Sequence, residues 1–375
     1  MARSRAARSS VLTLILLSTS LLVACGGGEG FASMEEGRGQ HTTTLLADGR
    51  VLVTGGRGSK ALASAEMYDL STNLWSPAGN MSGTRYGHNA TTLEDGLILV
   101  TGGDATNGTK PLASAELYNP STGTWSLTGS MNYPHGVGHT ATLLSGGKIL
   151  VAGGQSLIDG SRRVAAFAEL YDPSTGTWSL TGDMTEKRTG HKAILLKDDR
   201  VLVVGGASAE IYDPTTGAWS KAGEYSKAHK LDFAAVMLKD GRVLVSGGGE
   251  AKSYGTVASY THTDIYDPST GEWSTASEMN KKQREHTLSL LNDGSVLLLA
   301  LKSGELYDPV TDTWSLAGVM DENRAHLHTA TVLGDGTVLI VGGNRLTRDI
   351  YGGINKREGM ISIELYDPAV GWEAE

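Results

Sequence analysis

Short apolar runs separated by turn residues recur along the chain, and they follow one another in the same order each time. In "GHTATLLSGGKILVAGG", residues 139–144 form one β-rich run, a turn follows, and residues 148–152 form a second run. The second run is apolar without alternation here and again at 51–53 and 201–204, so we expect it to be covered on both faces. A third run ending at a tyrosine and a fourth carrying a tryptophan complete the unit. The pattern predicts a four-stranded antiparallel sheet in every ~40–50 residues.

Two kinds of turn separate the runs. Between the first and second runs the chain repeats Asp-Gly, which predicts a two-residue type I′ hairpin with positive φ at both positions. These turns are Asp48-Gly49, Asp95-Gly96, Asp240-Gly241, Asp293-Gly294 and Asp335-Gly336. Between the third and fourth runs, Asp-Pro-Ser-Thr-Gly at 172–176 and its equivalents predict a second tight turn.

Four landmarks show that the unit occurs seven times. The fourth run contains every tryptophan of the chain: Trp75, Trp125, Trp178, Trp219, Trp273, Trp314 and Trp372. The third run carries a tyrosine: Tyr68, Tyr118, Tyr171, Tyr212, Tyr266, Tyr307 and Tyr366. A glycine pair precedes six of these tyrosines: Gly55–Gly56, Gly102–Gly103, Gly153–Gly154, Gly205–Gly206, Gly247–Gly248 and Gly342–Gly343. Fourteen residues before the first glycine, six copies carry a histidine and the fifth carries Phe233: His41, His88, His139, His191, His286 and His328.

Sheets that are apolar on both faces are not stable alone, and packing seven of them in a ring covers these faces. The third residue of the first run is small in most copies, which suits the place where sheets converge on an axis. These residues are Thr43, Ala90, Ala141, Ala193, Ala235, Leu288 and Ala330. We therefore predict an all-β fold, a seven-bladed β-propeller of four-stranded antiparallel blades. The repeats run from His41 to Trp372, so closure of the ring is expected to rest on packing between blades one and seven.

Gly-Gly, Tyr and Trp at these intervals, with a period near fifty residues, resemble the kelch repeat. The resemblance covers residues 39–375, which we take as the propeller domain. It departs from the kelch pattern in the sixth copy, where Ala300 and Leu301 replace the glycine pair.

The N-terminus has a separate character. Arg3, Arg5 and Arg8 precede an apolar run at 11–24, and Cys25 follows it. This resembles a bacterial lipoprotein signal, so residues 1–24 are expected to be a signal peptide and 25–38 a flexible tether after a lipidated cysteine. The alternative is an ordinary cleaved secretion signal that carries a cysteine. Either signal implies export, and the lipoprotein signal implies attachment to the bacterial cell envelope through the lipid alone.

Composition and charge narrow the class of partner. The chain has 50 glycines in 375 residues and a net charge of −9, which becomes −12 when the three arginines of the signal are removed. An acidic balance without a basic stripe argues against nucleic acid. Cys25 is the single cysteine, so no intramolecular disulfide is expected. We expect a monomer without cofactor or metal.

Loop lengths distinguish two faces of the predicted ring. The spacing from Trp to the next histidine position is 13 or 14 residues, whereas that from the second glycine to Tyr is 12, 15, 17, 6, 18, 6 and 23. Both connections emerge on one face, here called the loop face, and the short turns occupy the opposite turn face. Insertions in repeat proteins gather on one face, often the binding face. The expected ligand-binding residues are Arg85, Tyr133, His135, Arg188, Lys230, Tyr254, His262, Arg284, Arg324, Arg345 and Tyr351. Their bases would attract an acidic ligand, unless they are merely solvated loop charges.

The repeated histidines and acids have two interpretations. A ring of imidazoles can bind metal, but recurrence at one repeat phase favours local hydrogen bonds that serve the fold. An acid two residues before each tyrosine is expected to form a hydrogen bond between blades: Glu66, Glu116, Glu169, Glu210, Asp264, Glu305 and Glu364. Catalysis would use residues that break the pattern: Tyr133, His135, His229, Tyr254, Tyr260, His262, His326 and Tyr351.

Three functional classes remain. The first is a membrane-anchored, non-catalytic module that binds a protein or glycan through the loop face. The second is an enzyme on a kelch scaffold acting on sugars or sugar acids, such as a mutarotase. The copper-radical chemistry of galactose oxidase, which resembles this chain in its repeats, needs a tyrosine crosslinked to a cysteine, and Cys25 lies outside the propeller. The third is a purely structural surface protein. We favour the binding module and name no catalytic residue.

Overall fold

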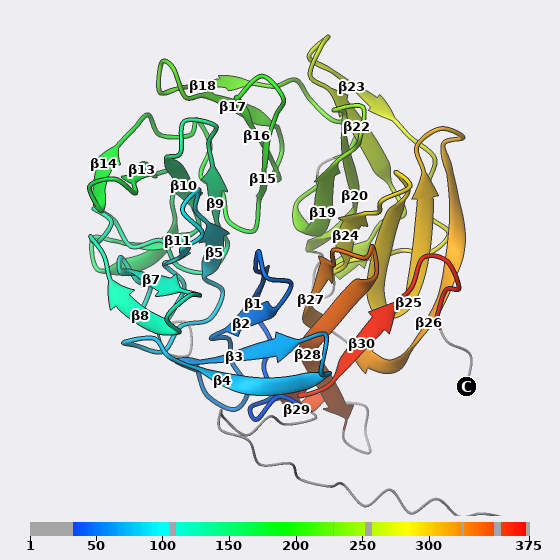
Figure 1. Ribbon diagram of the computed structural model, residues 1–375. Coiled ribbons are helices and arrows are strands. Elements are labelled where there is room, and N and C mark those ends of the chain that lie inside the picture. The colour runs from blue at the N-terminus through cyan, green and yellow to red at the C-terminus, as the bar shows by residue number, and fades with distance from the viewer. Residues whose placement is uncertain are drawn as a thin grey trace, which may run out of the picture.

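The structure, a computed structural model, describes residues 33–105, 110–227, 229–251, 257–324, 326–348 and 354–372. Antiparallel sheets stand around a common axis as the seven blades of a β-propeller, which confirms the predicted fold (Figure 1). The innermost strands contact their neighbours all round the ring, including the first and the last. These strands are β1 (Thr42–Leu45), β5 (Asn89–Thr92), β9 (His139–Leu143), β15 (Lys192–Leu195), β19 (Leu231–Met237), β24 (Thr287–Leu290) and β27 (His326–Val332).

Blades one to four each add three further strands to the inner one. Blade one adds β2 (Val51–Thr54), β3 (Ser64–Asp69) and β4 (Leu74–Asn80). Blade two adds β6 (Ile98–Thr101), β7 (Ala115–Asn119) and β8 (Thr124–Leu127). Blade three adds β10 (Ile149–Gly153), β13 (Ala168–Asp172) and β14 (Thr177–Leu180). Blade four adds β16 (Val201–Val204), β17 (Glu210–Asp213) and β18 (Ala218–Lys221).

The last three blades depart from this plan. Blade five contains β20 (Val243–Ala251), β22 (Thr263–Asp267) and β23 (Glu272–Thr275), with the extra β21 (Val257–Ser259) paired to β20. In blade six, β25 (Val296–Asp308) covers two strand positions and pairs with β26 (Thr313–Arg324). Blade seven contains β28 (Val338–Arg348), β29 (Ile354–Gly359) and β30 (Ile363–Tyr366). Within its described residues, the expected fourth strand of blade seven is reduced to an Asp367–Gly371 bridge.

The core lies between blades. Every residue of β2, β6, β10 and β16 is buried, as the unbroken apolar runs predicted. One cluster joins Leu52 and Met67 of blade one to Ile98 and Val100 of blade two. Because full burial of such a side chain stabilises by roughly 1.5–3 kcal/mol, each blade depends on its neighbours for much of its stability.

The Asp-Gly turns differ from the expected two-residue type. The amide of Gly49 donates to Leu46 O at 3.0 Å and the amide of Leu46 donates to Arg50 O at 2.8 Å, so the loop comprises residues 47–49. Gly49 has a φ of 87°, but Asp48 is not among the residues with positive φ. This is a three-residue hairpin loop with glycine in the left-handed position. The prediction of a type I′ turn was therefore wrong.

The ring closes through residues that we had expected to be a tether. Met34 and Arg38 are 1% and 0% exposed, and the amide of Arg38 donates to Met360 O of blade seven at 3.2 Å. A core cluster also joins Trp75 of blade one to Leu339 of blade seven, as expected for closure by packing. Residues 34–38 therefore belong to the propeller, and its boundary lies before the predicted residue 39. Cys25 and the proposed signal lie outside the described residues.

Candidate functional site

One position in each connector, the segment that links one blade to the next, joins both blades. In the second copy it is Arg85, whose carbonyl accepts a hydrogen bond from Gly56 of the preceding blade at 2.9 Å. Its guanidinium donates to Gly102 O at 3.0 Å and to Glu116 Oε1 at 2.6 Å in its own blade. Arg85 is 1% exposed, so it is a structural clamp between blades.

This finding corrects three of the expected ligand-binding residues. Arg188 and Arg324 form the same clamp as Arg85, with Glu210 at 2.8 Å and Glu364 at 2.9 Å. Both guanidinium groups are buried, so Arg85, Arg188 and Arg324 cannot meet a ligand on the loop face. The error arose because a repeated arginine was taken for an exposed charge.

His135 occupies the same clamp position in blade three and is also buried. Its Nδ1 lies 2.8 Å from Gly153 O and its Nε2 lies 3.5 Å from Glu169 Oε1, so the imidazole replaces a guanidinium. Tyr133 differs, because it is 36% exposed and stacks on Phe167 with 4.1 Å between ring centroids. Tyr133 therefore remains available to a ligand, whereas His135 does not.

The histidines at the start of the inner strands serve the fold. In five of them the Nε2 atom lies 2.9–3.3 Å from a hydroxyl of the preceding blade: His41 with Thr329, His88 with Thr42, His139 with Thr101, His191 with Thr140 and His286 with Ser246. Burial lowers the pKa of four of them to about 3: His41, His139, His191 and His286. Neutral imidazoles bonded across blades match the structural interpretation.

The repeated acids bind the backbone of the connector that leads into their own blade. The carboxylate accepts from an amide in six copies: Glu66 from Glu35, Glu116 from Ser82, Glu169 from Asn132, Glu210 from Thr185, Glu305 from Asn280 and Glu364 from Asp321. We had expected these acids to form a hydrogen bond between blades, and the structure shows instead that each one fixes the connector that enters its own blade. For Glu210, these bonds hold the pKa below its ordinary value against the opposing effect of burial.

The remaining expected bases lie at the surface in ion pairs. Lys230 is 2.5 Å from Glu250, Arg345 is 2.9 Å from Glu322, and Arg284 is 3.6 Å from Asp232. Pairing reduces the positive field that was expected to attract an acidic ligand. Tyr254 and Tyr351 lie outside the described residues, as does the side chain of His326.

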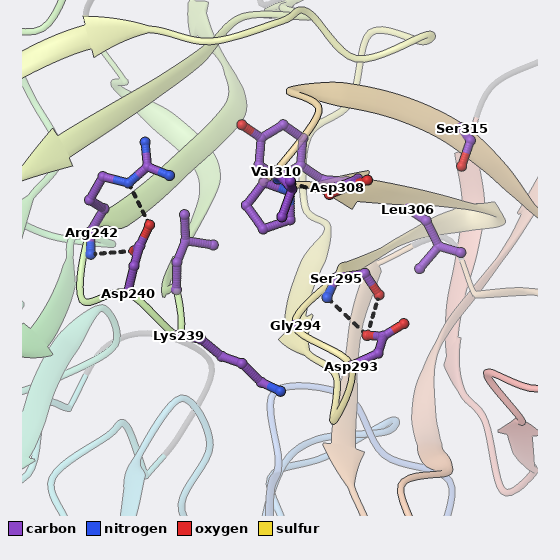
Figure 2. A pocket seen from close by; sticks show the side chains of 13 residues that line it. Lys239, Asp240, Arg242, Asp293, Gly294, Ser295, Leu306, Asp308, Val310 and Ser315 are labelled. Atoms are coloured by element: carbon purple, nitrogen blue, oxygen red, sulfur yellow. Dashed lines mark hydrogen bonds and ion pairs between the residues drawn. The ribbon is translucent and has the colours of Figure 1, made fainter.

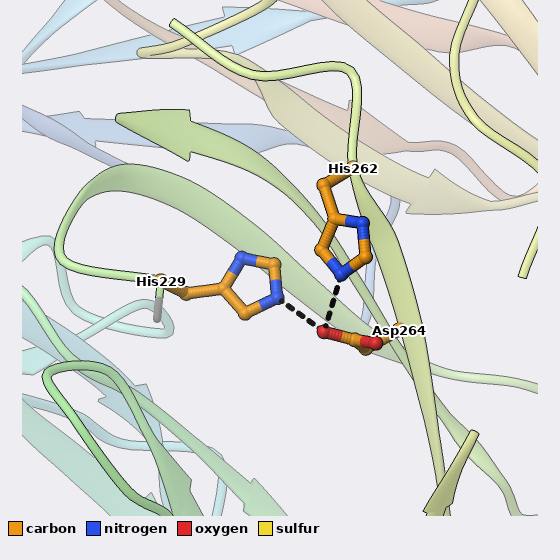
Figure 3. A group of neighbouring side chains, drawn as sticks. All are labelled: His229, His262 and Asp264. Carbon is orange, nitrogen blue, oxygen red and sulfur yellow. Dashed lines mark hydrogen bonds and ion pairs between the residues drawn. The ribbon is translucent and has the colours of Figure 1, made fainter. Parts of the chain in front are cut away.

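Blade five contains a buried cluster that the other blades do not repeat. His229 Nε2 lies 3.1 Å from Asp264 Oδ2, and His262 Nε2 lies 3.0 Å from the same oxygen (Figure 3). Ser226 Oγ lies 2.6 Å from His262 Nε2 and donates to Asp264 Oδ1 at 3.0 Å. His229 and His262 were expected to be residues that break the pattern, whereas Asp264 was taken for one more repeated acid.

Grooves on the turn face recur with the repeat. A groove of about 630 Å³ lies between blades five and six, where the turns at Asp240 and Asp293 lie on opposite sides (Figure 2). Similar grooves of about 480 and 500 Å³ lie between blades four and five and between blades one and two. Repetition at equivalent turns indicates that they result from blade packing. A smaller hollow of about 160 Å³ beside Arg345 and Met360 lies on the loop face.

Comparisons with known proteins agree with the fold. The model of the kelch motif matches residues 39–82 and 84–132. A comparison with curated proteins found no match. One similar solved structure is a fungal alcohol oxidase of the AA5 family in complex with copper, with 18% sequence identity and a TM-score of 0.72. The match covers 92% of this chain and 79% of that chain, and at this identity it shows a shared fold alone.

Proposed function

We propose that this protein is a non-catalytic binding module that engages a protein or glycan through its loop face. The long connections of blades three, five and seven extend there as the hairpins β11–β12 (Gln155–Ile158 and Ser161–Val164), β20–β21 and β28–β29. These hairpins supply surface that the fold does not need, because blades four and six form without them.

The observation that carries the proposal is a set of exposed apolar side chains at the loop-face ends of strands and connectors. They are 36–46% exposed: Tyr133, Leu157, Leu231, Leu301 and Ile361. Exposed apolar and aromatic side chains on one face are a feature of recognition surfaces. The stacked pair of Tyr133 and Phe167 offers a flat aromatic surface that suits a sugar ring or an apolar side chain.

The enzyme alternative receives no comparable support from the described residues. His135, His229 and His262 are buried between connector and blade. None of the three lines any of the four cavities described above. We therefore keep the binding module as the proposal.

A glycan array and a peptide library, each probed with the purified mature protein, test the proposal and separate the two ligand classes. Once a ligand is found, Tyr133→Ala and Leu157→Ser should weaken binding by about tenfold or more, because each removes a contact of roughly 1.4 kcal/mol. Leu74→Ser and Val310→Ser remove apolar side chains that are 41% and 91% exposed near the turn face. These controls should bind normally. Equal loss in both sets would contradict a binding site on the loop face.

Attachment to the bacterial membrane is a separate part of the proposal. It rests on Cys25 following an apolar run with a basic start. Mass spectrometry of the mature N-terminus should find a lipidated Cys25, and Cys25→Ala should release the protein from the membrane fraction. An unmodified cysteine on a soluble mature protein would support an ordinary secretion signal instead.

A further inference from the structure

Blade five differs from blade two at all three residues of the clamp. In blade two the clamp consists of Arg85, Ser114 and Glu116, with the guanidinium donating to Ser114 Oγ at 3.3 Å and to Glu116 Oε1 at 2.6 Å. Blade five carries histidine, histidine and aspartate at these positions: His229, His262 and Asp264. The other six copies carry glutamate at the third position, and none carries a second histidine at the middle position.

The three replacements meet at one point. The exposed fractions of His229, His262 and Asp264 are 1%, 4% and 0%, and their donor atoms all lie within 4.8 Å of one another. Both imidazoles point their Nε2 atoms at the same carboxylate oxygen (Figure 3). Asp264 has one methylene fewer than the glutamate of the other copies, and the second ring, His262, lies beside it.

The hydrogen bonds of His229 leave its Nε2 directed at the Asp264 carboxylate. Its Nδ1 lies 3.1 Å from Gly247 O, which can only accept, so this nitrogen carries the proton. The Nε2 of the same ring faces Asp264 Oδ2 at 3.1 Å, and either a proton or a metal ion must lie between these two atoms. A backbone carbonyl on the far ring nitrogen is also the usual outer contact of a metal-bound histidine.

We propose that His229 Nε2, His262 Nε2 and a carboxylate oxygen of Asp264 bind a transition-metal ion, with Zn²⁺ as the best match. Two imidazoles and one carboxylate suit zinc, whose bonds of about 2.0–2.2 Å place neighbouring ligand atoms roughly 3.3 Å apart. The two separations of 3.1 and 3.0 Å are close to this value. The proposal replaces the expectation of no metal and does not depend on the ligand of the loop face.

Ser226 gives the site a route to solvent and a candidate fourth ligand atom, its hydroxyl oxygen. It is exposed, whereas the three proposed ligands are buried, and its Oγ contacts both His262 Nε2 and Asp264 Oδ1. The ion would join the connector that carries His229 to the blade that carries Asp264. It would therefore take the place of the arginine clamp of the other blades, and its role is structural.

Two titrations of the chelator-treated mature protein test the site. Binding of Zn²⁺ is measured by calorimetry, and binding of Co²⁺ is measured by visible absorption. We expect one equivalent to bind and to raise the unfolding temperature. His262→Ser, which restores the residue of blade two, and Asp264→Asn should each weaken binding at least 100-fold. Circular dichroism establishes that each variant is folded.

His135→Arg is the matched control, because it changes the clamp histidine of a blade that has no second imidazole. It should bind Zn²⁺ as the unchanged protein does. Absence of stoichiometric binding by the unchanged protein, or equal binding by folded His262→Ser, would overturn the proposal.

Discussion

The carbonyl of Arg38 accepts a hydrogen bond from the amide of Gly343 at 3.1 Å, and this bond joins the beginning of the described chain to its last blade. The same bond occurs inside the ring, where the amide of Gly56 donates to Arg85 O at 2.9 Å. Closure between blades seven and one thus repeats an ordinary blade boundary. It needs no strand exchanged between the two ends of the chain.

The first prediction concerns the arginine clamps. Arg85→Ala should lower the free energy of unfolding by about 3–5 kcal/mol, because it leaves the buried Glu116 carboxylate without its cation. Arg38→Ala should lower it by a similar amount, because Arg38 forms the same pair with Glu66. Urea unfolding followed by tryptophan fluorescence measures both.

The control for the clamps is Arg50→Ala. Arg50 pairs with Asp48 at 2.7 Å at the surface, where an ion pair contributes about 1 kcal/mol or less. A loss at Arg85 no larger than the loss at Arg50 would show that the clamps do not hold the blades together.

The second prediction concerns the glycine pairs. Gly55 has a φ of 53°, and a Cβ there would lie 2.5 Å from Arg85 O of the next connector. Gly55→Ala should therefore lower the thermal unfolding midpoint strongly, since both strain and a backbone clash must be relieved. Gly83→Ala is the control, because nothing lies within 4 Å of its Cβ position. Equal stability of the two variants would contradict the close contact between blades.

The third prediction concerns acid pH. Burial lowers the pKa of His191 to about 3, so the folded state rejects a proton that the unfolded state accepts near pH 6.5. Stability from this histidine is complete above about pH 6.5 and is lost as the pH falls toward 3, by about 1.4 kcal/mol for each pH unit.

His191→Phe tests this dependence, because Phe233 already occupies the equivalent position in blade five. The variant should show a shallower loss of unfolding free energy between about pH 6 and pH 4 than the unchanged protein. An identical slope would mean that His191 is protonated in the folded state.

The fold could be predicted from the sequence because the same residues recur at equivalent positions from copy to copy. Trp125 and Trp178 occur at the same phase because each donates from its indole to the preceding blade, to Ala78 O at 3.0 Å and Gly129 O at 2.8 Å. The same bond recurs at Trp219, Trp273 and Trp314, so a residue that joins blades recurs at one phase of the repeat. The tether boundary was missed because the count began at His41, although Met34 and Arg38 repeat the spacing of Met81 and Arg85.

The candidate site was less predictable, because the type of a residue does not show whether its side chain is buried or exposed. Arg85 and Arg345 are both arginines assigned to the loop face, yet one is 1% exposed and the other has a side chain that is 58% exposed. Recurrence was the available signal, since an arginine found at one phase in several copies serves the fold. The cluster at Asp264 becomes visible only when the seven copies are aligned, because blade five alone differs from the clamp of blade two at all three positions, 229, 262 and 264.

Residues at repeated positions hold the ring together, and the substitutions in blade five at His229, His262 and Asp264 are not needed for folding. The most direct measurement is the urea unfolding midpoint of the metal-free triple variant His229→Arg, His262→Ser, Asp264→Glu, compared with that of the metal-free unchanged protein. We predict an equal or higher midpoint, because the variant restores the clamp found in blade two. A midpoint as low as that of Arg85→Ala would contradict the claim.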